Sequence, residues 1–171
     1  MLSSGSPLAA LVRAPVRPGI VRWIGLRPSR RAALVAVDAA ELSVEEGLVG
    51  DHYQSRGRRT RQVTLIQSED LAAIASFLGL THVVPAQLRR NVVVSGLNLL
   101  GLPGTLLRLG EAVVEVTGPC HPCSRMEETF GVGGYNAARS HGGITARVVQ
   151  GGKLSVGDAV VAQAGEEARG R

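Results

Sequence analysis

The chain has 171 residues, a length that suits a single domain with a substantial hydrophobic core. Its two cysteines are far too few for a disulfide framework, and no apolar run approaches the roughly 20 residues that cross a membrane. The net charge is +5 and Lys153 is the only lysine, so nearly all the cationic charge is arginine. That composition favours bidentate binding of phosphate or carboxylate and excludes chemistry that needs several lysines.

The two ends of the chain differ in composition from the middle. Residues 1–17 are rich in Ser, Ala and Arg and lack acids, and residues 163–171 are polar. We expect a flexible N-terminal segment, one domain over residues 18–162 and a flexible tail over residues 163–171. The start lacks the basic region that precedes the apolar core of a secretory signal, so we expect a cytoplasmic protein.

Short segments rich in Val, Ile and Leu, separated by Gly or Pro, are typical of β-strands. Because little lies between them to serve as crossover helices, the sequence predicts a mostly β (α+β) fold, an antiparallel β-barrel with a few short peripheral helices. The expected strands are Gly19–Leu26, Ala33–Val37, Gln62–Ile66, Asn91–Val94, Leu106–Gly110, Ala112–Gly118, Ile144–Gln150 and Asp158–Ala162.

One helix is expected from Ser68 to Leu78, because its apolar residues recur at helical spacing. Ser68 is the expected N-cap, Gly79 the expected end, and two acids lie in the first turn. The face expected to be buried consists of Leu71, Ile74, Ala75 and Leu78. We also expect a short helix over Ser124–Phe130 and a tight turn at Gln150–Lys153.

Both cysteines lie in one C-x-x-C motif, Cys120–Cys123, with a histidine and a proline between them. A structural zinc site would need two ligands besides the cysteines. The candidates are His121, which lies inside the motif, and three histidines that are distant in sequence. A thioredoxin-like redox pair would follow an early strand of a βαβ unit, which is not predicted here. Two buried structural thiols, or one reactive thiolate, are the remaining interpretations.

The surroundings of Cys123 favour the thiolate interpretation. Cys123 precedes the expected helix start at Ser124, and His121 and Arg125 add nearby positive charge, all of which favour the thiolate form. Glycines then follow in "FGVGGYNAARSHGGITARVV", where bare backbone amides next to Arg139 and His141 could close around an anion.

Ordered motifs over nearly the whole chain resemble the MOSC domain, named for the C-terminal part of molybdenum cofactor sulfurases. They are "RRNVVVSG", "LGEAVVEVTGPCHPCSRMEE" and "GGYNAARSHGGITARVVQGGKLSVGDAVV". Upstream, "VRWIGLRPSRRA", "EEGLVGDHY" and "RQVTLI" resemble stand-alone bacterial MOSC proteins. The resemblance covers roughly Pro18 to Val161.

The resemblance implies a barrel-like domain with an essential cysteine that carries sulfur as a persulfide or ligates molybdenum. Cys123 fits the family position best, and Cys120 is an addition whose role as a resolving or protecting thiol stays open. The implied catalytic residues are Cys123 and Cys120, with Cys123 also the molybdenum ligand through the cofactor. The implied cofactor-binding residues are Arg89, Arg90, Asn91, Arg125, Arg139, His141, Gly142, Asp51 and His52, and Arg58, Arg59 and Arg61 form a further basic cluster.

The implied cofactor is the molybdenum cofactor, molybdopterin. Full sulfurases carry a pyridoxal-phosphate desulfurase domain, for which this chain has no room, so pyridoxal phosphate is expected only on a partner cysteine desulfurase. The expected function is a molybdenum-cofactor-binding sulfur carrier or sulfurtransferase. The alternatives are a molybdenum-dependent reductase subunit for N-hydroxylated or sulfoxide substrates, or a non-enzymatic cofactor-trafficking module. A molybdoenzyme or redox partner is expected, and no membrane or nucleic acid.

Overall fold

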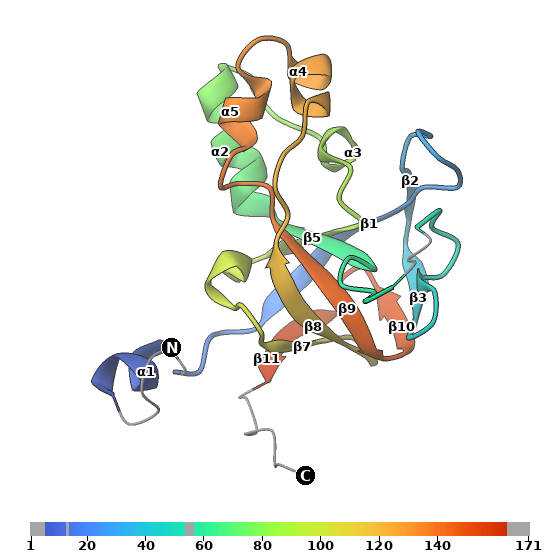
Figure 1. Ribbon diagram of the computed structural model, residues 1–171, viewed down its shortest axis with the longest axis vertical. Helices are drawn as coiled ribbons and strands as arrows, with labels where there is room; N and C mark the ends of the chain where they lie inside the picture. Colours follow the sequence, from blue (N-terminus) through green and yellow to red (C-terminus); the bar gives the residue numbers. More distant parts are fainter. Residues whose placement is uncertain (1–5, 13, 54–56, 164–171) are drawn as a thin grey trace.

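The computed structural model describes residues 6–12, 14–53 and 57–163 (Figure 1). The strands are β1 (Gly19–Leu26), β2 (Val35–Val37), β3 (Ala39–Ser43), β4 (Gly47–Leu48), β5 (Val63–Gln67), β6 (Val92–Ser95), β7 (Leu106–Leu109), β8 (Ala112–Pro119), β9 (Ile144–Gln150), β10 (Gly152–Ser155) and β11 (Ala159–Gln163). The helices are α1 (Pro7–Val12), α2 (Ser68–Leu78), α3 (Pro85–Leu88), the 3-10 turn η1 (Leu99–Gly101), α4 (Arg125–Phe130) and α5 (Gly134–Ala138).

Seven strands close into a barrel in the order β1, β11, β7, β8, β9, β5 and β6, with β6 returning to β1. Closure pairs every barrel strand on both sides and so removes the exposed edges of an open sheet. Strand β2 pairs with one end of β1, while β10, β3 and β4 form a separate three-stranded sheet. The predicted mostly β barrel with short peripheral helices is therefore confirmed.

The sequence predicted an antiparallel barrel, but one pair of barrel strands is parallel. Strands β5 and β6 run parallel, with Leu65 opposite Val92. Parallel neighbours need a long crossover connection, and helices α2 and α3 supply it between β5 and β6. The prediction of a wholly antiparallel barrel was wrong because helix α2 is part of the crossover between β5 and β6.

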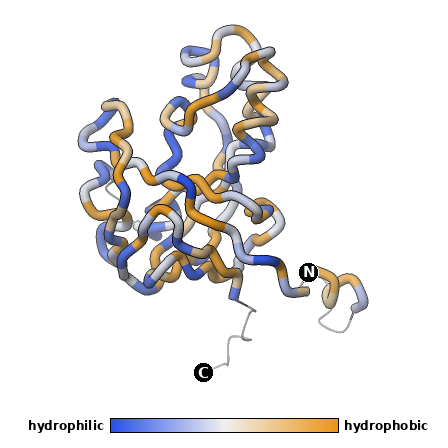
Figure 2. Tube along the Cα trace, turned by 180° about the vertical axis from the view of Figure 1, so that it is seen from behind, coloured by the Kyte–Doolittle hydropathy of each residue, from blue (hydrophilic) through white to orange (hydrophobic). Residues whose placement is uncertain are grey.

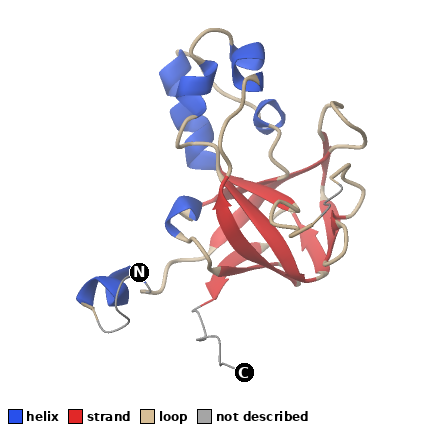
Figure 3. Ribbon diagram, viewed as in Figure 1, coloured by secondary structure: helices blue, strands red, loops and turns tan. Residues whose placement is uncertain are grey.

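Apolar side chains of β5 and β6 serve two cores. Val92, Val94 and Leu65 point into the barrel, where they join its main hydrophobic cluster. Ile66 and Val93 point to the opposite face, where α2, α4 and α5 cover them. Apolar residues therefore stand next to each other in both strands, at Leu65–Ile66 and Val92–Val94. Figures 2 and 3 show the helical layer above one end of the barrel, with apolar stretches in both parts.

Helix α2 has the predicted bounds and the predicted buried face, and Gly79 ends it in the left-handed conformation at φ 66°. The prediction that Ser68 is the N-cap was wrong. Gln67 occupies that position with extended backbone, because β5 runs through Gln67 directly into the helix. Ser68 is the first helical residue, and its hydroxyl donates to the Glu69 carboxylate.

Three short strands were not predicted. Strand β3 has only one buried residue, Leu42, and β4 has two residues, so neither shows the apolar alternation of a half-buried strand. Strand β10 begins at Gly152, inside the predicted turn, and pairs with β3 instead of folding back on β9. The predicted second helix is confirmed as α4, with Ser124 at its N-cap.

The expected flexible segments lie largely outside the described residues. Residues 1–5, 13 and 164–171 are not described, and Pro7–Val12 form helix α1, which stands apart from the barrel in Figure 1. No helix in the described part of the chain is long and apolar enough to cross a membrane.

Candidate functional site

The two cysteines lie on the segment that leaves the end of β8. This segment rises to α4, and the chain returns through α5 to Gly142, Gly143 and strand β9. The Cys120 amide donates to the Gly143 carbonyl at 2.8 Å, which ties the outgoing and returning segments together. A Cβ on Gly142 would collide with the Cys120 carbonyl oxygen, and one on Gly143 with the Leu65 carbonyl oxygen. The close approach of these segments therefore requires glycine at both positions.

Arg90 is buried beneath the cysteine segment and is held by backbone carbonyls. Its Nε donates to the Gly142 oxygen at 2.6 Å, its Nη1 to the Leu88 oxygen at 2.7 Å, and its Nη2 to the Cys120 oxygen at 3.5 Å. Only 8% of the residue is exposed. Arg90 thus braces the cysteine segment against the return to β9.

Above this brace lies a cavity of about 560 Å³, large enough for a cofactor-sized ligand. Both cysteines line it. Both are free thiols, Cys120 buried and Cys123 exposed. Seven of its described lining residues are arginines, and none is an acid. The arginines are Arg27, Arg30, Arg31, Arg61, Arg89, Arg90 and Arg125, and the other lining residues include His52, Tyr53, Thr64, Asn91, His121 and Met126. We call this the basic cavity.

The concentrated positive charge is visible in the pKa values of two arginines. Burial lowers the pKa of Arg89, and the neighbouring Arg27 and Arg125 lower it further. Burial also lowers the pKa of Arg90, whereas Cys120 and Cys123 raise it through their anionic forms. Both guanidinium groups remain charged at neutral pH. An anion in the basic cavity would relieve this repulsion.

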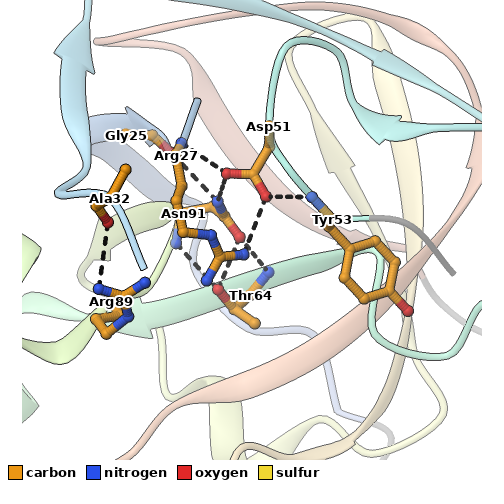
Figure 4. A network of polar contacts seen from close by, with 8 residues as sticks. All are labelled: Gly25, Arg27, Ala32, Asp51, Tyr53, Thr64, Arg89 and Asn91. Atoms are coloured by element: carbon orange, nitrogen blue, oxygen red, sulfur yellow. Dashed lines mark hydrogen bonds and ion pairs between the residues drawn. The ribbon is translucent and has the colours of Figure 1, made fainter. Parts of the chain in front are cut away.

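Asp51 holds one wall of the basic cavity in place (Figure 4). Its Oδ1 accepts from the Arg27 amide at 2.7 Å and from Asn91 Nδ2 at 3.2 Å. Its Oδ2 accepts from Arg27 Nη2 and from the Tyr53 amide, both at 3.1 Å. The Asp51 side chain is 1% exposed. Asp51 therefore orients cavity-lining residues and does not line the cavity itself.

Asn91 ties the same wall to the barrel. Its Nδ2 donates to the Gly25 carbonyl at 3.2 Å, and its Oδ1 accepts from the Thr64 hydroxyl at 2.9 Å. The neighbouring Arg89 differs from Arg90, because its only described side-chain contact is Nη1 to the Ala32 carbonyl at 3.3 Å. The sequence analysis assigned both arginines to cofactor binding. In the structure, most donors of Arg89 remain available to a ligand, whereas Arg90 holds backbone carbonyls below the cavity.

The remaining predicted residues lie elsewhere. Arg139 and Gly142 line a second cavity on the other side of the cysteine segment. His141 lines neither cavity, because its Nδ1 pairs with Asp70 Oδ1 at 2.7 Å. In the basic cluster, only Arg61 reaches the cavity, with its Nη2 3.9 Å from Cys120 Sγ, while Arg59 donates to the Val44 carbonyl.

Sequence reasoning did not single out the arginines that follow β1. Arg27, Arg30 and Arg31 reach the basic cavity from the loop between β1 and β2. Their signal was the run "LRPSRR" directly after a predicted strand, where a loop on a rigid scaffold is a common place for a site.

The acids next to the motif do not oppose its positive charge directly. The Glu127 carboxylate accepts from the Gly133 and Tyr135 amides, each at 3.1 Å. These two hydrogen bonds lower the pKa of Glu127 and place its charge at the start of α5. Within the described residues, no group of three or more His, Cys, Asp or Glu side chains could hold a metal ion.

Comparison with solved structures supports the fold. The YuaD protein from Bacillus subtilis has a TM-score of 0.76 at 19% identity, and the match covers 88% of this chain and 98% of that one. YiiM from Geobacillus stearothermophilus has a TM-score of 0.70 at 18% identity, covering 90% and 78% of the two chains. YiiM from Escherichia coli has a TM-score of 0.65 at 21% identity, covering 86% and 71%.

A search of curated protein sequences gives no match. The family model for the MOSC domain matches residues 52–161, which include Asn91, both cysteines and the glycines that return the chain to β9. MOSC domains are associated with molybdenum cofactor sulfurase-like proteins. With well over half of its length matched by that model, this chain belongs to the MOSC domain family.

Proposed function

We propose that this protein is a sulfur carrier or sulfurtransferase that binds the molybdenum cofactor and uses Cys123 as its working thiol. The observation that carries the proposal is the exposed Cys123 thiol on a cavity of about 560 Å³ lined by seven arginines and, among described residues, by no acid. A sulfur carrier needs a thiol that both a donor and an acceptor can reach. Cys120, which is buried, meets that requirement less well.

The donor groups of the basic cavity fit the molybdenum cofactor. This cofactor joins a phosphate to a metal held by dithiolene sulfur, so it suits a site with cations at one part and a soft thiolate at another. Arg89, Arg125 and the arginines after β1 would bind the phosphate, and Cys123 would face the metal. When bound, the cofactor would supply the metal centre that accepts sulfur.

The loading of Cys123 requires a partner that carries a persulfide, such as a cysteine desulfurase. The Cys123 thiolate attacks the outer sulfur of the donor persulfide, and a new S–S bond forms on Cys123. The S–S bond of the donor breaks, and the donor thiolate leaves with the electron pair. The exposed position of Cys123 on the basic cavity leaves its sulfur open to the donor.

A reductase role is the second candidate, and the same exposed thiol favours it. Since the described residues contain no metal-binding cluster, Cys123 would be one protein ligand to a metal that brings its own sulfur ligands. N-hydroxylated or sulfoxide compounds would then be reduced with electrons from a redox partner. Molybdenum retained in stoichiometric amount after purification would favour the reductase role. Retained cofactor without catalytic turnover would instead favour a cofactor-trafficking module.

The deciding experiment is intact-protein mass spectrometry after incubation with a cysteine desulfurase and cysteine. We expect a mass increase of one sulfur atom on the wild-type protein, reversed by a thiol reductant. Cys123→Ser should abolish the increase, and Cys120→Ser, the matched control within the same motif, should retain most of it. Full loading of Cys123→Ser would overturn the assignment of the working thiol, and no loading of any variant would overturn the sulfur-carrier role.

A further inference from the structure

A second cavity, of about 530 Å³, lies on the other side of the cysteine segment. Its floor is apolar and buried, formed by Leu99, Val116 and Ile144, which are at most 2% exposed. Its walls add Leu100 together with Pro103, Pro119 and Pro122. A cavity of this size with mainly apolar walls is typical of a binding site for a small organic molecule.

The second cavity is distinct from the basic cavity. The two share only Cys120 and His121 among their described lining residues, so the cysteine segment is the partition between them. Seven arginines line the basic cavity, whereas Arg139 is the only arginine of the second. The two cavities therefore suit ligands of different polarity and charge.

Arg139 and Ser140 are adjacent polar residues that line the second cavity, and His121 also lines it. Arg139 is exposed, and no ion pair joins its guanidinium to a described residue. Ser140 beside it has φ 68°, a left-handed conformation that costs a residue with a side chain roughly 1–2 kcal/mol. Such strained positions concentrate at binding sites, where the surrounding structure maintains them. Arg139 and Ser140 together offer a forked cation and a hydroxyl beside an apolar floor.

We propose that the second cavity binds a small apolar carboxylic acid. The apolar body lies on Leu99, Val116 and Ile144, and the carboxylate meets the guanidinium of Arg139, which matches its planar geometry. One cation balances one carboxylate, whereas a phosphate with two charges finds a better match in the basic cavity. The apolar body also favours the second cavity, because contact with the buried floor of Leu99, Val116 and Ile144 removes it from water. This site does not depend on the proposed sulfur chemistry.

The test compares phenylbutyrate with its neutral analogue phenylbutyramide by isothermal titration calorimetry on the full chain. We expect phenylbutyrate to bind about tenfold more tightly, since the amide cannot form the charge-assisted contact. Arg139→Gln should remove that difference and leave the affinity for the amide unchanged. Leu100→Trp, which fills the cavity from its half-exposed wall, should weaken both probes.

Two matched arginine variants control for charge. Arg125→Gln removes a cation from the basic cavity, and Arg108→Gln removes an exposed one from β7, outside both cavities. Both should bind phenylbutyrate as the wild type does. A larger loss in Arg125→Gln than in Arg139→Gln would overturn the proposal, because the acid would then occupy the basic cavity. Equal affinity of the wild type for the two probes, or no binding of either, would overturn it as well.

Discussion

Replacing Arg90 with methionine should destabilise the fold, although the sequence presents this residue as an anion-binding partner of Arg89. Methionine retains much of the apolar volume of the arginine side chain and removes its donors. In the structure, those donors contact the carbonyl oxygens of Gly142, Leu88 and Cys120. The substitution leaves these acceptors without their partner at the base of the cysteine segment.

The magnitude follows from the contact distances. The bonds at 2.6 and 2.7 Å have short, charge-assisted geometry, for which losses of about 1.5–3 kcal/mol each are usual. The contact at 3.5 Å lies at the limit of a hydrogen bond, and we assign it nothing. Burial of the guanidinium, which lowers the pKa of Arg90, offsets part of the gain. A net loss of about 3 kcal/mol in the free energy of unfolding results, or roughly 6–12 °C in Tm.

Urea and thermal unfolding measure this loss, with Arg125→Met as the control. Arg125 lines the same cavity and is half-buried, so its replacement should change the free energy of unfolding by no more than about 0.5 kcal/mol. If Arg90→Met unfolds within about 1 kcal/mol of the wild type, Arg90 is not the brace that the contacts indicate. Equal losses in both variants would point to a general effect of removing charge.

Two further predictions concern residues on either side of this brace. In calorimetric titrations at low salt, Arg125→Gln should bind pyrophosphate about tenfold more weakly than the wild type, and this loss should become smaller as ionic strength rises. Unchanged affinity would count against the basic cavity as an anion site. His141→Ala removes the partner of Asp70, a residue that is 5% exposed, and should cost about 2 kcal/mol in urea unfolding. The exposed His82, replaced by alanine, should change stability little, and equal losses would contradict this view of the pair.

Local pattern was sufficient for most of the fold. Strands β1 and β9 have the predicted bounds, because both are short segments rich in Val and Ile with Gly or Pro next to their ends. What local pattern could not supply is strand direction. The β5–β6 pair is parallel because α2 and α3 carry the chain across, and only the closure of the barrel determines where β6 returns. Strand β3, with Leu42 as its only buried residue, is held by pairing with β10 and β4, which a one-dimensional pattern does not reveal.

The sequence indicated part of the lining of the basic cavity and did not indicate the separate roles of its residues. Cys120, Cys123, Arg89 and Arg125 do line one cavity. Burial could not be read from the pair "RR" at positions 89–90, because two adjacent residues leave a turn in different directions. Arg89 is a left-handed helix cap at φ 57° and Arg90 is the next residue toward β6. The same backbone turn that presents Arg89 at the cavity therefore sends Arg90 under the cysteine segment.

This division of roles has a consequence for a site that we propose to bind a phosphate next to a working thiol. A ligand phosphate would occupy the donors of the arginines that it contacts, and an arginine that also held the cysteine segment would have its donors divided between the ligand and the protein. Two of the five N–H groups of Arg90 donate short hydrogen bonds to carbonyls, and the residue is buried, so a ligand in the cavity has little access to it. Arg90 can therefore hold the cysteine segment in place while Arg89, Arg125 and the arginines after β1 bind an anion, and the two tasks need not compete.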